Sequence, residues 1–542
     1  LMAYDREMDR DARQFSDATP SFSVGRTVAH YARRIRLLDK ALEGADLKTL
    51  ESLASPDFSW LVTRKDRGLT PEDTSRMESL YLHYLVWETR DGLETEKKRL
   101  HSQLVHLAGK PDLSLRWMID WCNENAGGNP LTRQSFWGGS RNVSPDEKVR
   151  PAFTAQGFRM IMDILDELEN SLENPGDLNA KKTGFLSWYR ETYRKTWLKF
   201  AVAFPGGAAT LAGPGEKMTV AKNIAAGRGP CFALLDVMAR ELPVCLDEHE
   251  PAPEWISRIL EFSAVRNHVE KPEAATEQDL AGTVKKKGLA FLEKSKPAAL
   301  GGMSQEALNS KRDLYLRYKQ SLENLALTAT SRPSAFKLAT DVFTEDPAMG
   351  QSALAVSLRH ADELKTTLAH RTGTGAVADR LIDSPMDFLW SLAAEKAACH
   401  MQDLWNETVL AEVQGVRDPK VKADMLMGKD GGLVQTFVKG PAAPFIGRDA
   451  RRGYYSRNIG GKTLVFNNAF LAYLTKSSIS AKSEQGLYKV RIDGMPTDTN
   501  PEAGVLPHMT RLELQCSGSA QVLNYLNYPA GRQFEWNPDE CG

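Results

Sequence analysis

The stretch FLSWYRETYRKTWLKFAVAFP, from Phe185 to Pro205, carries aromatic residues at intervals of three or four positions. At that spacing the aromatic side chains share one face of a helix, and most of the basic residues fall off that face. We expect the helix to end at Pro205-Gly206-Gly207, because proline lacks the backbone donor and glycine accepts helix-ending conformations. Such a stripe predicts a helix in a packed core rather than a cofactor site. Its members are Phe185, Tyr189, Tyr193, Trp197, Phe200 and Phe204.

The same helical period runs from Phe22 to about Leu426. A helix before the aromatic stripe is expected to begin after Thr154, whose side chain can cap the exposed amides, and to end at Asn174-Pro175-Gly176. A later segment, LYLRYKQSLENLAL, repeats the pattern with Leu314, Tyr318, Leu322 and Leu325. Most of the chain therefore predicts packed helices.

The period changes to two after about residue 455. In GLYKVRID, HMTRLELQCSG and RQFEWNPDECG, apolar residues alternate with polar ones, so every second side chain lies on one face of a sheet. The sequence thus predicts a mainly α-helical, multi-lobe body followed by a small C-terminal antiparallel β domain, sandwich-like with one buried face. The alternating apolar positions are Tyr488, Val490, Ile492, Leu512, Leu514, Cys516, Phe534 and Trp536.

Length and loop composition suggest how the chain divides. At about 100–200 residues per domain, 542 residues predict three or four units. Loops rich in Gly, Pro, Asn and Ser lie near residues 123–147, 211–218 and 271–288. We expect four segments, namely an N-terminal helical domain over 1–145, a helical domain over 146–270, a second helical region over 271–440 and a β-rich domain over 441–542.

Composition and charge narrow the class of function. Hydrophobic residues make up 42% and charged residues 26% of the chain, as in ordinary globular proteins. A net charge of -1 and a pI near 6.9 give no support to nucleic-acid binding, which uses a concentrated basic surface. The basic triplets at 97–99 and 285–287 stand beside acidic residues and predict solvated helix faces or linkers.

No stretch of the sequence is apolar enough to predict a membrane span. The most apolar uncharged run, Phe200 to Gly215, contains four Gly and two Pro and is shorter than the ~20 residues needed to cross a bilayer. The charged N-terminus lacks the apolar core of a signal peptide. Because the chain begins with Leu1, we expect a fragment whose membrane-anchoring part lies upstream.

A search for catalytic motifs gives no candidate. The nearest approach to a phosphate loop, at Gly213, has the wrong spacing and follows a helix. His101 and His106 stand five apart, which puts them on different faces of a helix, whereas paired metal ligands need a spacing of four. No GxSxG elbow occurs, and the paired carboxylates lie on charged helix faces. We therefore predict no catalytic, cofactor-binding or metal-binding residue, and a protein that is not an enzyme.

Six cysteines are too few to form the framework of a chain this long. Cys516 and Cys541 bracket the predicted β unit, so a disulfide between them is one expectation in an oxidising compartment. Two unpaired buried thiols are the other.

Three regions together resemble the IcmF/TssM family of type VI secretion proteins. The first motif region joins VRPAFTAQGF, residues 149–158, to the aromatic stripe at 185–205. The second motif region is residues 433–474, with a "F-x-x-G-P-x-x-P-F" segment, a later Gly-Tyr, then "G-x-x-[LI]-x-F" and "F-L". The third motif region, residues 512–542, has "Y-P" followed by "F-x-W-x-P". The matching residues are Phe153, Thr154, Gly157, Trp188, Tyr189, Tyr193, Trp197, Phe437, Gly440, Pro441, Pro444, Phe445, Gly453, Tyr454, Gly461, Leu464, Phe466, Phe470, Leu471, Pro529, Phe534 and Trp536.

The resemblance implies a periplasmic ectodomain of an inner-membrane protein. It implies a structural scaffold of the type VI secretion membrane complex, which joins the inner-membrane protein TssL to the outer-membrane lipoprotein TssJ, self-associates and forms the envelope-spanning channel. Residues 146–270 would be the IcmF-related domain, and the loops of the β domain would dock the lipoprotein. Relatives continue with further strands, which implies that the β domain over 441–542 is truncated. The motif residues are expected to determine cores and turns rather than contacts with partners.

Two other classes of function stay open. A periplasmic cell-wall hydrolase with a helical body and a β binding module would need an enclosed cleft with two convergent carboxylates or a metal ion. A membrane-tethered adaptor without a role in secretion would be a monomer that does not bind the lipoprotein.

Overall fold

The computed structural model describes residues 2–56, 58, 70–143, 147–172, 176–247, 250–270, 305–346, 349–368, 375–428, 431–449, 453–480, 488–495, 508–516, 519–526 and 528–536. The chain forms two compact units, and each is a body of its own. Unit 1 comprises Leu1–Thr330 and Ala348–Leu392, and unit 2 comprises Ser331–Pro347 and Ala393–Gly542.

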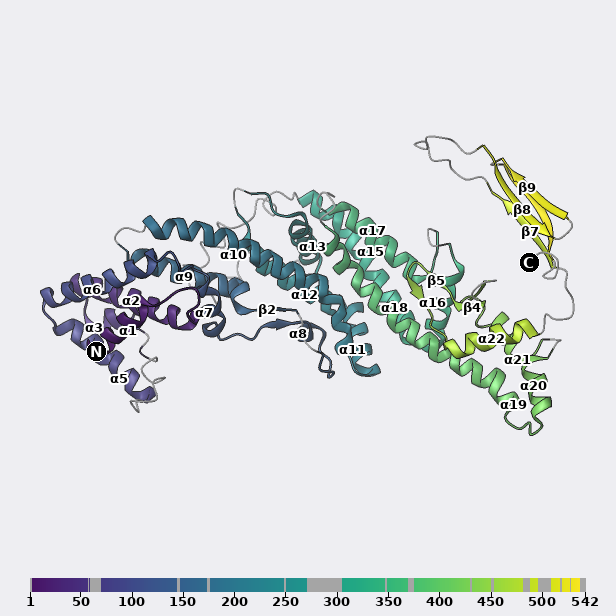
Figure 1. Cartoon of the computed structure of the whole chain (residues 1–542), viewed down its shortest axis with the longest axis horizontal. Helices are drawn as coiled ribbons and strands as arrows, with labels where there is room; N and C mark the ends of the chain where they lie inside the picture. Colours follow the sequence, from purple (N-terminus) through teal and green to yellow (C-terminus); the bar gives the residue numbers. More distant parts are fainter. Residues whose placement is uncertain are drawn as a thin grey trace. The chain divides into compact units, whose positions relative to one another are not determined.

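Unit 1 is helical, with one short β pair (Figure 1). Its first half contains α1 (Met2–Arg13), α2 (Ser21–Leu42), α3 (Leu47–Glu51), α5 (Pro71–Trp87), α6 (Arg90–Gly109), α7 (Trp117–Asn125), β1 (Leu131–Thr132), α8 (Arg133–Trp137), β2 (Lys148–Val149), η1 (Pro151–Phe153) and α9 (Ala155–Asn170). Its second half contains α10 (Gly176–Ala203), η2 (Phe204–Thr210), α11 (Pro214–Ala225), α12 (Pro230–Glu241), η3 (Leu242–Cys245), α13 (Glu254–Glu270), α15 (Gln305–Thr330), α17 (Ala353–Thr367) and the start of α18 (Ala376–Trp405).

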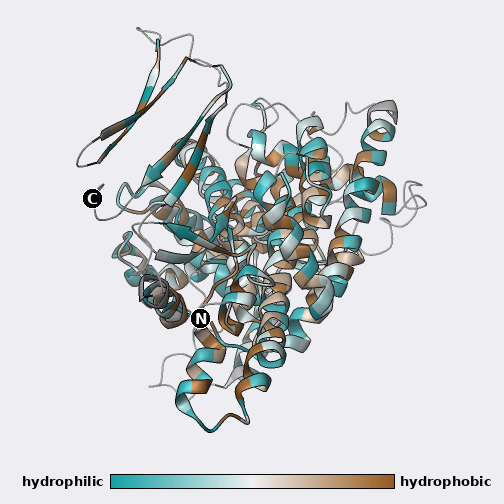
Figure 2. Cartoon of the chain, turned by 90° about the vertical axis from the view of Figure 1, so that its right-hand side faces the viewer, coloured by the Kyte–Doolittle hydropathy of each residue, from teal (hydrophilic) through white to brown (hydrophobic). Residues whose placement is uncertain are grey.

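The aromatic stripe predicted from the sequence lies in α10 and η2, and all six of its side chains are buried. The α-helix ends at Ala203, and the Phe204–Thr210 turn that contains Pro205 follows it, as the proline and glycine signals predict. Elsewhere in unit 1, α2 packs against α6, α7 and α9, and α15 packs against α11, α13 and α17. Figure 2 shows hydrophilic and hydrophobic residues mixed along the helices of the chain, as in amphipathic helices that pack by one face.

Unit 2 begins with α16 (Arg332–Thr344) and resumes with the end of α18. It continues with the π-helical turn η4 (Asn406–Leu410), α19 (Ala411–Val413), α20 (Pro419–Met427), α21 (Leu433–Lys439), β3 (Ile446–Asp449), β4 (Gly453–Ser456), β5 (Asn458–Ile459), β6 (Lys462–Thr463) and α22 (Asn468–Ser480). The strands β3 and β4 form one antiparallel pair, and β5 and β6 form another.

The helix α22 lies within a region that the sequence predicted as β-rich. The side chain of Asn467 accepts a hydrogen bond from the backbone N–H of Ala469 at 2.8 Å, which favours a helix start. Leu471 and Leu474 are buried three positions apart, which is a helical spacing. Two buried positions cover only one helical turn, which is too short for a helical period to be recognised in the sequence.

Two antiparallel ribbons end the chain. The strand β7 (Tyr488–Gly494) pairs with β10 (Ala530–Trp536), and β8 (Thr510–Cys516) pairs with β9 (Ser519–Tyr525). The ribbons meet where the side-chain amide of Gln521 on β9 donates to the carbonyl of Glu535 on β10 at 2.6 Å and accepts from its N–H at 2.9 Å. These strands confirm the predicted helical body with a small C-terminal antiparallel β region.

The expected buried face of the β region is incomplete in the two ribbons. Leu523 and Phe534 are buried, whereas Val490 is 48% exposed and Leu512 is 41% exposed. Two-stranded ribbons present more surface than a closed sandwich, so alternation alone does not bury every apolar position.

The boundaries expected near 145 and 270 fall at segments outside the described residues, 144–146 and 271–304. The boundary expected near 440 falls within unit 2. The four-part division stays a prediction. Among the described helices, none combines the length and the apolar composition of a membrane span.

Replacing Trp197 by alanine tests the importance of the α10 core. Trp197 is fully buried, and its indole N–H donates to the carbonyl of Phe153 at 2.9 Å. We expect Trp197→Ala to lower the free energy of unfolding of unit 1 by about 3–5 kcal/mol, from lost burial and a residual cavity. Guanidinium unfolding followed by circular dichroism measures the change.

The control is Trp87→Ala, because Trp87 is 80% exposed. We expect this variant to change the free energy of unfolding by no more than about 0.5 kcal/mol. An equal loss in both variants would contradict the central position of Trp197.

Candidate functional site

The two parts of the first motif region pack directly on each other in unit 1. Thr154 caps α9 by accepting a hydrogen bond from the N–H of Gly157 at 3.1 Å. The aromatic stripe of α10 then binds the preceding turn η1, because Tyr189 donates its hydroxyl hydrogen to the carbonyl of Ala152 and Trp197 donates to Phe153. The ring of Phe153 lies 5.8 Å from that of Tyr189. These motif residues therefore form one core.

Tyr193 and Trp188 take different positions on α10. The hydroxyl of Tyr193 donates to the carbonyl of Glu241 at 2.9 Å, which ties α10 to the end of α12. Trp188 is partly exposed, and the guanidinium of Arg116 lies 4.5 Å from its ring centroid. Trp188 thus lies at the surface of the core, whereas Tyr193 lies inside it.

Gly157 allows the start of α9 to approach the η1 turn. A Cβ at this position would lie 2.1 Å from the carbonyl oxygen of Pro151 and 2.7 Å from the Cα of Ala152. Both atoms belong to the backbone, so neither can move aside as the end of a side chain can. The motif glycine is required by close packing.

The second motif region builds the aromatic core of unit 2. Phe445 is fully buried, with its ring 5.2 Å from Phe343 and 5.9 Å from Phe336 of α16. Trp405 at the end of α18 contacts the rings of Phe437 and Phe470 at 5.0 and 5.3 Å.

Phe466 and Phe470 are partly exposed and stack at 6.5 Å. Together with Trp405, Phe437 and Met401 they line an apolar pocket of about 390 Å³. Leu464 and Leu471 of the same motif region are buried. The second motif region therefore combines a closed core with an open aromatic groove in unit 2.

The glycines and prolines of this region lie at turns. Gly440, Pro441 and Pro444 lie in the turn between α21 and β3, and the carbonyl of Pro444 accepts from the Arg457 side chain at 3.0 Å. Gly461 has a φ of +79° in the β5–β6 turn, a conformation that favours glycine.

Gly453 and Tyr454 fix β4 to α22. Gly453 has a φ of +73°, and a Cβ there would lie 2.3 Å from the Thr475 hydroxyl oxygen. The backbone N–H of Tyr454 donates to that same hydroxyl at 2.9 Å. Both motif residues therefore serve one close contact between a strand and a helix.

The third motif region lies in the ribbons. Phe534 is buried, Trp536 lies 5.1 Å from the ring of Tyr488 on the paired strand, and Pro529 is exposed just before β10. Cys516 is disulfide-bonded. Its predicted partner, Cys541, lies outside the described residues, so the pairing stays a prediction.

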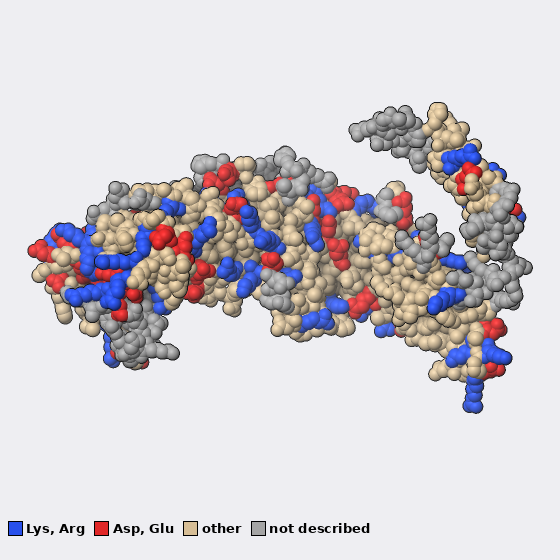
Figure 3. All heavy atoms as spheres, in the orientation of Figure 1, with Lys and Arg blue, Asp and Glu red and all other residues tan. Residues whose placement is uncertain are grey.

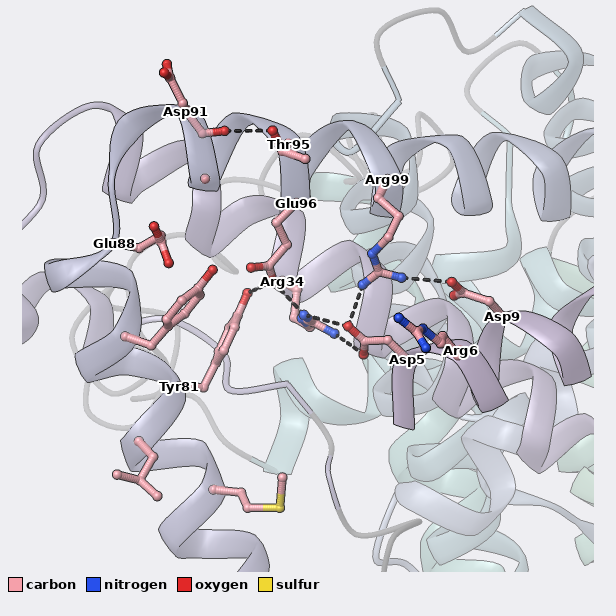
Figure 4. A pocket seen from close by; sticks show the side chains of 14 residues that line it. Asp5, Arg6, Asp9, Arg34, Tyr81, Glu88, Asp91, Thr95, Glu96 and Arg99 are labelled. Carbon is pink, nitrogen blue, oxygen red and sulfur yellow. Dashed lines mark hydrogen bonds and ion pairs between the residues drawn. The ribbon is translucent and has the colours of Figure 1, made fainter. Parts of the chain in front are cut away.

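A pocket of about 840 Å³ in unit 1 is lined by α1, α2, α5 and α6 (Figure 4). At its floor the side chain of Arg34 is fully buried and binds Asp5 at 2.7 Å and Glu96 at 2.5 Å. Arg99 binds Asp5 at 2.5 Å and Asp9 at 2.8 Å. The hydroxyl of Tyr81 also donates to Glu96 at 2.9 Å. Burial raises the pKa of Tyr81, Arg34 opposes this effect, and Glu96 adds to it.

Sequence reasoning missed this network and misread one of its members. The triplet at 97–99 was predicted to be a solvated face or linker, yet the Arg99 side chain is 34% exposed and forms two ion pairs, and Lys97 binds Asp39 at 2.7 Å. The other triplet, 285–287, lies outside the described residues. The residues of the ion-pair network lie on three different helices, so no local spacing in the sequence could predict the pairs. The spacing of four between Asp5 and Asp9 on one helix face was the one local signal.

The charges elsewhere show no single-sign surface on the face drawn in Figure 3, where Lys and Arg lie among Asp and Glu. Within the described residues, no group of three or more His, Cys, Asp or Glu side chains is arranged to hold a metal ion. Comparisons of the chain with family models, with curated proteins and with solved structures find no significant match. The function is therefore inferred from the motif regions and from the geometry of the two units.

A matched pair of glycine substitutions tests the packing of the first motif region. We expect Gly157→Ala to destabilise unit 1 by about 1–3 kcal/mol, because the new Cβ meets backbone atoms at the η1 turn. Gly184→Ala lies in α10 with nothing within 4 Å of its Cβ, and we expect it to stabilise by about 0.5–1 kcal/mol. Chemical unfolding of both variants checks the signs, and a stabilised Gly157→Ala would contradict the close approach.

The thiols of unit 1 are predicted to be unreactive in the folded protein. Burial raises the pKa of Cys122 to about 11, and it raises those of Cys231 and Cys245 to about 12. The thiolate is the nucleophile, so a raised pKa leaves few reactive groups at pH 8. We expect Ellman's reagent to modify the partly exposed Cys399 of unit 2 in the native, non-reduced protein, and the three buried thiols after unfolding. Cys399→Ser should remove the native reaction, and rapid labelling of that variant would contradict the assignment.

Proposed function

We propose that this chain is a periplasmic scaffold of the type VI secretion membrane complex, of the IcmF/TssM family. The observation that carries the proposal is the packing of the motif regions. The helix start at 149–158 and the aromatic stripe at 185–205 form one core, although more than 25 residues separate them in the sequence. The residues of the second motif region converge in the same way in unit 2. Motifs that form cores support a shared fold more strongly than scattered matches do.

The architecture suits a scaffold. Long helices such as α10 and α15 provide extended packed surface, and the C-terminal ribbons provide exposed apolar side chains. The disulfide at Cys516 supports an oxidising compartment such as the bacterial periplasm. A contact with the inner-membrane protein TssL and self-association in the complex complete the proposal.

We assign lipoprotein docking to the ribbons. Exposed apolar residues lie on two of the strands and next to the strand ends, and burying them against TssJ would stabilise a complex by about 25 cal/mol per Å² of apolar surface, less the costs of association. These residues are Val490, Met495, Met509, Leu512, Leu526 and Tyr528, each between 41% and 76% exposed.

The alternative of a cell-wall hydrolase receives less support from the geometry. Carboxylates do converge in the pocket of unit 1, but Asp5, Asp9 and Glu96 are bound by Arg34 or Arg99. Carboxylates held in this way serve as structural ion pairs more readily than as proton donors. The proposal therefore assigns the chain no catalytic role.

Calorimetric titration of the full chain with the TssJ lipoprotein from the same genome tests the proposal. We expect saturable one-to-one binding, which a chain lacking residues 488–542 should lose. Leu526→Asp should weaken binding at least tenfold, because it places a charge on the proposed apolar surface.

The matched control is Met349→Asp in unit 1, where Met349 is 73% exposed. It should bind like the unchanged chain. A folded full chain that does not bind TssJ would overturn the proposed function. Equal weakening of binding by both substitutions would show that the docking site does not lie on the ribbons.

A further inference from the structure

The pocket between α1, α5 and α6 carries more negative than positive charge. Five carboxylates and three guanidinium groups line it. The arginines Arg34 and Arg99 are bound to Asp5, Asp9 and Glu96, which closes the floor of the pocket. Glu88 accepts hydrogen bonds from the N–H and the hydroxyl of Thr89 and has no ion pair with any described residue, whereas the carboxylate of Asp91 points away from the pocket in Figure 4. The remaining negative charge therefore lies toward the junction of α5 and α6.

Tyr84 reports the same negative potential. The carboxylates of Glu96 and Glu88 line the pocket beside its hydroxyl. Burial, and next the two carboxylates, raise the pKa of Tyr84 well above its ordinary value. A field that disfavours a further negative charge at this position favours a positive one.

The other wall of the pocket is apolar and open to solvent. Met77, Leu80 and Tyr84 follow one another on α5 at helical spacing, and Leu80 is 66% exposed. The same stripe continues to Trp87, which is 80% exposed at the end of the helix. A bound group therefore meets apolar surface and carboxylates side by side.

We propose that this pocket binds a peptide segment of a partner protein in which a basic side chain is flanked by apolar residues. The ammonium or guanidinium group would lie beside Glu88, whose carboxylate faces the pocket in Figure 4, and the ring of Tyr84 adds attraction for a cation. The apolar neighbours would cover Leu80 and Trp87. A volume of about 840 Å³ holds more than one side chain, which favours a segment over a lone cation. The inference goes beyond the scaffold function and does not rest on it.

Titration of the full chain with two matched peptides tests the proposal. The probe is acetyl-Leu-Leu-Arg-Leu-Leu-amide, and its partner carries citrulline, a neutral isostere, in place of arginine. Heteronuclear NMR or calorimetry at low salt should give saturable binding of the arginine peptide. Binding of the citrulline peptide should be at least fivefold weaker, and so should binding of the arginine peptide to Glu88→Gln.

Glu94→Gln is the control variant, because Glu94 lies on the same helix outside the pocket and pairs with Arg90 at the surface. It should bind the arginine peptide as the unchanged chain does. Equal affinity for both peptides, or equal weakening by Glu94→Gln, would overturn the proposal. Agmatine, a free alkylguanidinium, should bind more weakly than the arginine peptide. If agmatine bound as tightly as the peptide, the ligand of the pocket would be a small cation and the proposed peptide segment would be wrong.

Discussion

The hydrogen bonds that α10 donates to the turn before α9 organise unit 1. Tyr189 and Trp197 bring a hydroxyl and an indole N–H into the core, where an unpaired polar group would be costly. The carbonyls of Ala152 and Phe153 satisfy both donors, so the η1 turn has one position against α10. That position brings the start of α9 so close that a side chain at residue 157 would meet the backbone. Since α9 also packs on α2, the position of η1 against α10 also limits where α2 can lie in the unit.

Buried ion pairs link several other helices of unit 1. The side chain of Arg258 on α13 is 1% exposed and binds Asp379 on α18, and Lys365 on α17 binds Asp383 on α18 at 2.7 Å. Removing either cation would leave a partly buried carboxylate without this partner, which destabilises the packed helices. An ion pair forms over a narrow range of distances, so each pair favours one register between its two helices. Apolar contacts alone would allow the helices to shift along each other more easily.

The sequence allowed the long helices and the β strands to be predicted, because their periods extend over many residues. The stripe from Phe185 to Phe204 is an example, and its burial in α10 and η2 confirms the prediction. The helix α22 was missed because two buried leucines in a Gly- and Asn-rich region are too little for a period. The ion-pair network was missed for another reason. Asp5, Arg34 and Glu96 are brought together by the packing of three helices, and a charged residue that will be buried has the same local pattern as one that stays in water.

The seam between the two ribbons differs in mechanical terms from the pairing inside each of them. Within β7–β10 and β8–β9 seven residue pairs face one another in each ladder, so pulling along the strands loads many backbone bonds in parallel. Between β9 and β10 the hydrogen bonds involve the side chains of Gln521 and Arg532. A tensile load across this seam acts on a few bonds, and each of them can re-form by rotation of one side chain. We therefore expect the seam to yield before the strands of either ribbon slide apart.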